Sequence, residues 1–186
     1  VNAIKIGMLH APEIVDVVAW AIDHYQLKNV VLDPVMVATS GDRLIASETV
    51  QVLVRELFPR ATLITPNLDE AVLLLGREIS DASVLELAGR DLLAMGAHAV
   101  LLKGGHLRGD DVMDLLVQSN SPSERLASRR IQSRNVHGTG CTLSSAIAST
   151  ATAAVFKHPL SMTLITPDGA EIPVTGATNK KMSGEI

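Results

Sequence analysis

HGTGC, at residues 137–141, runs directly into TLSSAIA, at residues 142–148, and this stretch guides the interpretation of the whole chain. Two glycines around a threonine leave the backbone free to adopt unusual dihedral angles and to approach a ligand without a Cβ in the way. The residues that follow are small and compatible with a helix, so we expect a tight loop that opens a helix from Thr142. The first N–H groups of such a helix have no internal partner and lie at the positive end of its dipole. The stretch therefore predicts an anion-binding site, although many short glycine loops only turn the chain.

Cys141 makes this loop more specific, because a thiol at the start of a helix is stabilised in its thiolate form. The competing interpretation is a small, buried apolar residue, which is the usual situation of a free cysteine. With one cysteine in 186 residues the chain has no internal disulfide, which fits a reducing compartment such as the cytoplasm.

The composition is that of one globular domain of ordinary size. Apolar residues make up 47% and charged residues 19% of the chain, which excludes a disordered or fibrous protein. The 16 Lys and Arg against 20 Asp and Glu give a net charge of -4 without a basic block, so neither nucleic acid nor a membrane surface is expected as a partner. No apolar run approaches the roughly 20 residues that a membrane-spanning helix needs.

Short apolar runs alternate with segments of helical periodicity along most of the chain. Strands are expected at Ala3–Ile6, Val30–Asp33, Thr62–Ile64 and Ala99–Lys103, and helices at Ala11–Gln26, Ser47–Leu57, Asn67–Leu75 and Asp81–Met95. These strands lack the polar alternation of a half-exposed sheet, so the pattern predicts an α/β fold with a parallel sheet covered on both faces. Val112–Val117 and Leu126–Asn135 are expected to form a hairpin at the sheet edge.

The two ends of the sequence suggest a fragment of a longer protein. Val1 occupies the usual place of an initiator methionine, and an apolar segment follows almost at once. Near the other end, Met162–Ile165 and Ile172–Val174 flank a Pro-Asp-Gly turn, which predicts a β-hairpin. We therefore expect a hairpin in the C-terminal tail.

Distinctive residues follow each of the four predicted parallel strands, at the edge where ligands bind in a wound α/β sheet. Each has a purely structural interpretation as well. Met8 fits a core position, Asp33 fits a turn that caps its own backbone, and Lys103 fits an edge residue whose amine reaches solvent. Asn67 and Glu70 have the spacing of a capping box at the start of a helix.

The sequence at 137–141 resembles the phosphoryl-transfer loop of the ribokinase superfamily, and its cysteine is characteristic of the hydroxymethylpyrimidine and phosphomethylpyrimidine kinases. Sugar kinases of that superfamily carry aspartate at the position of Cys141. The pair Asn67-x-x-Glu70 after a strand, and Lys103 before two glycines, are similar to further signatures of the superfamily. The resemblance covers roughly residues 5–149 and implies a ribokinase-like fold, here truncated at the N-terminus. Because it ends near Ser149, it also implies a domain at 1–149 and a divergent tail at 150–186.

The resemblance also implies roles for the glycine-rich loop and for the lysine. Gly138, Thr139 and Gly140 would offer N–H groups to the transferred phosphoryl group. Cys141 would lie beside the acceptor hydroxyl as a base or thiolate, and Lys103 would neutralise charge on the nucleotide phosphates.

The remaining assignments concern the metal ion and the substrate. By resemblance, Asp33 and Glu70 would manage a Mg²⁺ ion, and Asn67 would join Glu70 in holding it through water against the phosphates. Met8 and Val35 would line the pocket for the substrate ring.

Together these assignments imply an ATP- and Mg²⁺-dependent kinase that phosphorylates 4-amino-5-hydroxymethyl-2-methylpyrimidine and then its monophosphate in thiamin biosynthesis. Such an enzyme is expected to be cytoplasmic and, when complete, a homodimer. Two alternatives stay open: a pyridoxal kinase of the same fold, and a truncated remnant without catalytic activity. His106 and His137 receive no role.

Overall fold

A computed structural model of the chain describes residues 1–38, 41–79, 81, 84–105, 110–130, 138–150, 162–165 and 171–174. Six strands form one sheet in the order of the sequence. They are β1 (Ile4–Ile6), β2 (Val30–Leu32), β3 (Leu63–Ile64), β4 (Ala99–Leu102), β5 (Asp111–Gln118) and β6 (Glu124–Arg129). The first four strands pair in parallel, and β5 and β6 add an antiparallel hairpin at one edge. The predicted α/β class and the edge hairpin are therefore confirmed, although β6 begins two residues earlier than expected, and residues 131–135 lie outside the described part.

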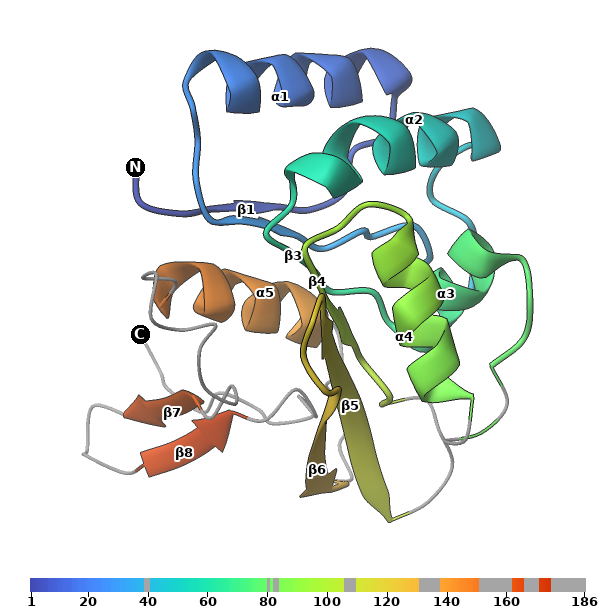
Figure 1. Ribbon diagram of the computed structural model, residues 1–186, viewed down its shortest axis with the longest axis vertical. Helices are drawn as coiled ribbons and strands as arrows, with labels where there is room; N and C mark the ends of the chain where they lie inside the picture. Colours follow the sequence, from blue (N-terminus) through green and yellow to red (C-terminus); the bar gives the residue numbers. More distant parts are fainter. Residues whose placement is uncertain are drawn as a thin grey trace.

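Helices cover both faces of this sheet, as the sequence predicts (Figure 1). The helices are α1 (Pro12–His24), α2 (Ser47–Leu57), α3 (Leu68–Leu75), α4 (Leu85–Ala94) and α5 (Thr139–Thr150), with a 3₁₀ turn, η1 (Phe58–Arg60), after α2. Helices α1 to α4 contribute to the larger core on one face, whereas α5 packs on the other face. Alternate strand residues serve the two cores: Leu32 points to the first and Val31 to the second, which is why both faces of the strand are apolar.

The apolar residues predicted along the first helix do form a helix, but many of them face away from the core. The buried positions are Val15, Ala19 and Ile22. Val17 and Tyr25, whose helical spacing supports the helix predicted at Ala11–Gln26, are each 63% exposed. The helix carries two apolar rows, and periodicity does not distinguish the row that meets the sheet.

The C-terminal part contains a separate two-stranded antiparallel sheet of β7 (Met162–Ile165) and β8 (Glu171–Val174). These strands coincide with the predicted hairpin, apart from one extra residue at the start of β8. The domain boundary at 149/150 stays a prediction. Among the described residues, no helix combines the length and apolarity that crossing a bilayer requires.

Candidate functional site

Three of the predicted site segments meet at the carboxyl ends of the parallel strands. Asp33 directly follows β2, and Lys103 directly follows β4. The Lys103 ammonium Nζ donates a hydrogen bond of 3.0 Å to Asp33 Oδ1. A Cβ added at Gly140 would lie 3.0 Å from the same Nζ, so the first turn of α5 lies directly beside this ion pair. Residues far apart in sequence are thus brought together where the topology predicts.

Asp33 is the most heavily bonded side chain of this group, with a relative exposure of 1%. Thr65 Oγ1 donates to its Oδ1 at 3.0 Å, and Ser144 Oγ donates to its Oδ2 at 3.1 Å. Lys5 adds a second ammonium group, 3.7 Å from Oδ2. Burial would raise the pKa of Asp33, but Lys103, supported by Lys5 and Thr65, outweighs burial and holds that pKa below its ordinary value.

The glycine-rich loop is shorter than predicted, because α5 begins at Thr139 rather than Thr142. Gly138 has φ +77°, a conformation that favours glycine, and its carbonyl accepts the Thr142 N–H at 2.9 Å. Thr139, Gly140 and Cys141 therefore occupy the first helical turn, whose N–H groups point out of the helix end. His137 lies outside the described residues. Cys141 is exposed, so its interpretation as a small buried residue is wrong.

Asn67 and Glu70 form the capping box that their spacing predicts. Asn67 Oδ1 accepts the Glu70 N–H at 2.9 Å, and Glu70 Oε2 accepts the Asn67 N–H at 2.7 Å. Glu70 is buried, and this burial raises the pKa of its carboxyl to about 7 even though Lys103 and the Asn67 N–H act in the opposite direction.

The structure adds a third buried carboxylate, Asp114 on β5, that sequence reasoning missed. Its Oδ1 accepts the Gly104 N–H at 2.9 Å, and its Oδ2 has no hydrogen-bond partner among the described residues. Burial raises the pKa of Asp114 to about 6 despite the Gly104 N–H. The available signal was an acidic residue in the middle of the apolar run VMDLLV.

Lys5, Thr65 and Ser144 were also missed as site residues. Lys5 carries a recognisable signal, since it is a charged residue between Ile4 and Ile6 in a buried strand. The hydroxyl groups of Thr65 and Ser144 carry none, because threonine and serine are common after strands and in small-residue helices.

The two residues predicted for the substrate pocket lie near the same strand ends. Met8 is 49% exposed, so the alternative interpretation of Met8 as a core residue is wrong. Val35 is half-buried, and its N–H donates to the Asp33 carbonyl at 2.8 Å. His106 lies outside the described residues.

The carboxylates do not fit a directly coordinated metal ion. Among the described residues, no three His, Cys, Asp or Glu side chains gather as a metal site. Both Asp33 oxygens already accept hydrogen bonds, and Glu70 Oε2 is engaged in the capping box. Glu70 and Asn67 remain suited only to contacts with a hydrated ion through water.

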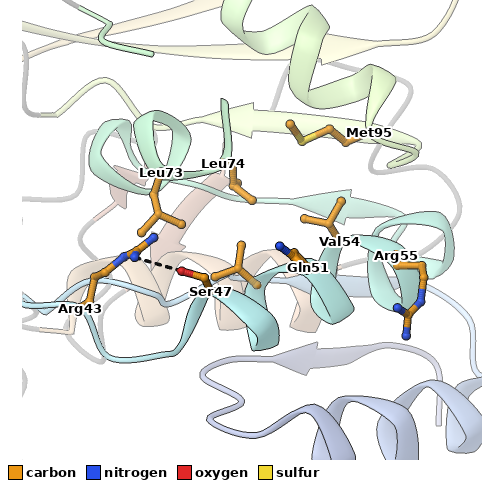
Figure 2. A pocket seen from close by; sticks show the side chains of 9 residues that line it. Arg43, Ser47, Gln51, Val54, Arg55, Leu73, Leu74 and Met95 are labelled. Carbon is orange, nitrogen blue, oxygen red and sulfur yellow. Dashed lines mark hydrogen bonds between the residues drawn. The ribbon is translucent and has the colours of Figure 1, made fainter. Parts of the chain in front are cut away.

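A separate pocket of about 420 Å³ lies between α2 and α3 (Figure 2). Its lining includes Leu73, Leu74 and Met95 together with polar groups, of which Arg43 Nη1 donates to Ser47 Oγ at 3.2 Å. None of the residues predicted for the phosphoryl-transfer site lines it. The chemistry predicted from sequence therefore belongs to the strand ends and not to this pocket.

Comparison with known proteins gives consistent matches. The family described as phosphomethylpyrimidine kinase matches residues 1–157, which extends past residue 149, where the predicted resemblance ends. The hydroxymethylpyrimidine/phosphomethylpyrimidine kinases of Rhizobium meliloti (strain 1021) and Escherichia coli (strain K12) are each 46% identical, over 150 and 151 residues. Each match covers 80% of this chain and 56% of the relative, so the chain spans little more than half the length of these curated relatives.

Solved structures of two related kinases also align with the chain. Bacillus subtilis pyridoxal kinase in complex with ADP has a TM-score of 0.74 and 37% identity, covering 82% of this chain and 59% of that one. The phosphomethylpyrimidine kinase from Clostridium difficile 630 has a TM-score of 0.69 and 35% identity, covering 86% and 62%. These matches confirm the ribokinase-like fold.

Proposed function

Because the chain belongs to the phosphomethylpyrimidine kinase family, we propose that the protein of which it is part phosphorylates a hydroxymethylpyrimidine, and then the monophosphate, with ATP as donor. The observation that carries this proposal is the meeting of Lys103 and Asp33 with the first turn of α5, where Gly140 lies against the lysine ammonium. Phosphoryl transfer relies mainly on positioning and charge stabilisation, and such an arrangement offers both.

In the proposed reaction the substrate hydroxyl oxygen forms a bond to the γ-phosphorus of ATP while the bond from that phosphorus to the ADP oxygen breaks. Cys141, exposed in the first turn of α5, takes the hydroxyl proton. The N–H groups around Gly138, Thr139 and Gly140 receive the transferred group, and Lys103 offsets the negative charge of the phosphates.

Mg²⁺ would neutralise phosphate charge when it is bound with ATP. Glu70 and Asn67 would hold such an ion through water, because their oxygens are engaged in the capping box. Asp33 does not fit direct coordination of the ion, because both of its carboxylate oxygens already accept hydrogen bonds from the protein.

The pyrimidine substrate is favoured over pyridoxal by the relatives named above. The curated pyrimidine kinases are 46% identical to this chain, whereas among the solved structures the pyridoxal kinase is 37% and the phosphomethylpyrimidine kinase 35% identical, so the preference for pyrimidine rests on the curated relatives and the family match. Met8 and Val35 are the residues we assign to the substrate ring. A cytoplasmic location, supported by the single free cysteine, and a homodimer of the complete protein are further parts of the proposal.

The decisive experiment compares kcat/KM for hydroxymethylpyrimidine and for pyridoxal, each with ATP. It uses the 186-residue chain and a version extended at both ends to the length of the curated relatives. We expect the extended protein to prefer hydroxymethylpyrimidine and to accept the monophosphate as a second substrate. Equal or reversed preference would assign it as a pyridoxal kinase, and a folded extended protein without turnover on either alcohol would support the non-catalytic alternative.

A further inference from the structure

Asp33 joins four different segments of the fold through one buried carboxylate. Its partners are Lys5 of β1, Thr65 after β3, Lys103 after β4 and Ser144 of α5. Asp33 itself follows β2, and its N–H donates to the Ile6 carbonyl at 2.9 Å. The Asp33 side chain therefore connects α5 to the ends of the four parallel strands.

The number of these contacts limits what else Asp33 can bind. An ionised carboxylate has about four lone-pair positions, and three of them accept hydrogen bonds from Thr65, Lys103 and Ser144. The Lys5 ammonium adds an ion pair at 3.7 Å, and the positive charges of the two lysines also oppose a nearby dication. At 1% exposure the carboxylate has no free face toward a ligand. Asp33 is thus saturated from within the protein.

Ser144 is the contact that reaches α5. Its side chain is fully buried, and its hydroxyl lies 3.0 Å from the Gly140 carbonyl and 3.1 Å from the Cys141 carbonyl of its own helix. Serine hydroxyls within helices commonly bond to such carbonyls. The hydroxyl has a single hydrogen to donate, and of the three acceptors within reach the ionised Asp33 Oδ2, at 3.1 Å and 111 residues away in sequence, accepts the strongest hydrogen bond.

We propose that Asp33 and Ser144 are positioning residues that fix the first turn of α5 against β2 and keep the Lys103 ammonium beside Gly140, and that Asp33 is not a metal ligand. We call the contact of Ser144 with Asp33 the lock, and it is a property of the folded chain whether or not the protein is a kinase. Its consequence for catalysis rests on the proposed kinase function, because that function gives Lys103 and the first turn of α5 the phosphates as ligands.

The first test measures the lock without any activity. Amide hydrogen exchange is compared for the 186-residue chain, for Ser144→Ala and for Ser145→Ala, an exposed neighbour on the same helix that serves as the matched control. Ser144→Ala is expected to speed exchange of the amides bonded to the first-turn carbonyls of α5, such as the Thr142 N–H on the Gly138 carbonyl, by roughly tenfold, the effect of losing one hydrogen bond to a charged group. Ser145→Ala should leave it unchanged. Equal exchange in all three proteins would overturn the lock, whether or not the protein is a kinase.

The second test separates positioning from metal binding in the extended protein. Ser144→Ala and Thr65→Val are expected to lower kcat by roughly 10- to 100-fold, as small misplacements of catalytic groups do, with the half-saturating Mg²⁺ concentration unchanged. Asp33→Asn should lower kcat further, again without a change in the Mg²⁺ requirement. An Asp33→Asn variant that needs tenfold more Mg²⁺, while Ser144→Ala behaves like wild type, would overturn the proposal.

If Asp33→Asn does not fold, Ser144→Ala and Thr65→Val still decide the question. A wild-type extended protein that lacks turnover would refute the proposed function and leave the exchange test of the lock intact. The two proposals therefore fail by different observations.

Discussion

Asp33 and Asp114 both contact the Lys103–Gly104 segment and both are buried, yet their pKa values are shifted in opposite directions. Asp33 meets the segment through the Lys103 ammonium, and the pKa of Asp33 is lowered. Asp114 contacts it through the Gly104 N–H and has its pKa raised to about 6, and in the described part of the chain its other oxygen has no hydrogen-bond partner. Burial raises both pKa values and the Lys103 charge lowers both, so the difference comes from the direct hydrogen bonds of Lys103 and Thr65 and the second ammonium group, Lys5, which act on Asp33. We call the residues around Asp33 and Lys103 the Asp33 side, and the contact of Gly104 with Asp114 the Asp114 side. We infer that the Asp33 side takes part in the reaction and that the Asp114 side fixes the shape of the turn.

The largest effect expected on the Asp33 side is on rate. If Cys141 acts as the base, Cys141→Ala in the extended protein should lower kcat by roughly 10²–10⁴-fold, with little change in substrate affinity because the anion-binding donors are backbone groups. Cys141→Asp should keep part of the rate, since aspartate occupies this position in the sugar kinases that the sequence resembles. Cys141 is exposed, so the thermal midpoint should scarcely move. Wild-type turnover of the alanine variant would remove the thiol from the mechanism.

The largest effect expected on the Asp114 side is on stability. A Cβ at Gly104 would lie 1.9 Å from the Met113 carbonyl oxygen, so Gly104→Ala must force β4 and β5 apart. We expect the free energy of unfolding to fall by roughly 3 kcal/mol or more, as for other severe backbone clashes. Gly105→Ala is the matched control, because among the described residues its Cβ would meet only a Val112 methyl group, at 4.0 Å. Urea unfolding of both variants measures the difference, and similar midpoints would contradict the tight approach at Gly104.

A third prediction uses pH to distinguish the two carboxylates. The lowered pKa of Asp33 gives stability that is present above its ordinary value of 3.8 and is lost as the pH falls below 3.8 through the lowered pKa, so Asp33→Asn should cost stability at pH 7 and progressively less as the pH falls below 3.8. The raised pKa of Asp114 gives stability that is present below 3.8 and is lost as the pH rises through about 6. Asp114→Asn should therefore become more stable relative to wild type between pH 4 and pH 8, by about 1–3 kcal/mol. Unfolding free energies that change in the same direction for both variants would refute the contrast.

The same contrast explains what the sequence could predict. The capping box of Asn67 and Glu70 was predictable, because its partners lie within one helical turn. The meeting of Asp33 and Lys103 was predictable from topology, since the ends of parallel strands share one edge of the sheet. The contact from Ser144 to Asp33 was not, because it depends on how α5 docks on the second face.

Asp114 was missed for a related reason. Its contact with Gly104 depends on the antiparallel register of β4 and β5, in which Leu102 lies opposite Leu115. A strand can be predicted from its own residues, whereas its register depends on the partner strand and the connecting turn. At the loop at 137–141 the error of the sequence prediction is smaller: its glycines predicted the turn, but α5 begins three residues earlier than expected.

The smallest predicted effect concerns Met8, which follows β1 on the Asp33 side. Its neighbour Gly7 lies against Lys5, where an added Cβ would be 3.0 Å from the amine, so Met8 begins the segment that leaves this charge cluster. Because Met8 is half exposed, Met8→Ala should change the thermal midpoint little. If its side chain packs on the pyrimidine ring, the variant should raise KM for hydroxymethylpyrimidine by about five- to tenfold, which corresponds to ~1 kcal/mol of lost apolar contact, with kcat unchanged. Leu9→Ala is a useful comparison, because Leu9 packs against the larger core and should lower stability instead. A Met8→Ala variant with an unchanged KM and a lower thermal midpoint would show that Met8 contributes to packing and that other residues contact the substrate ring.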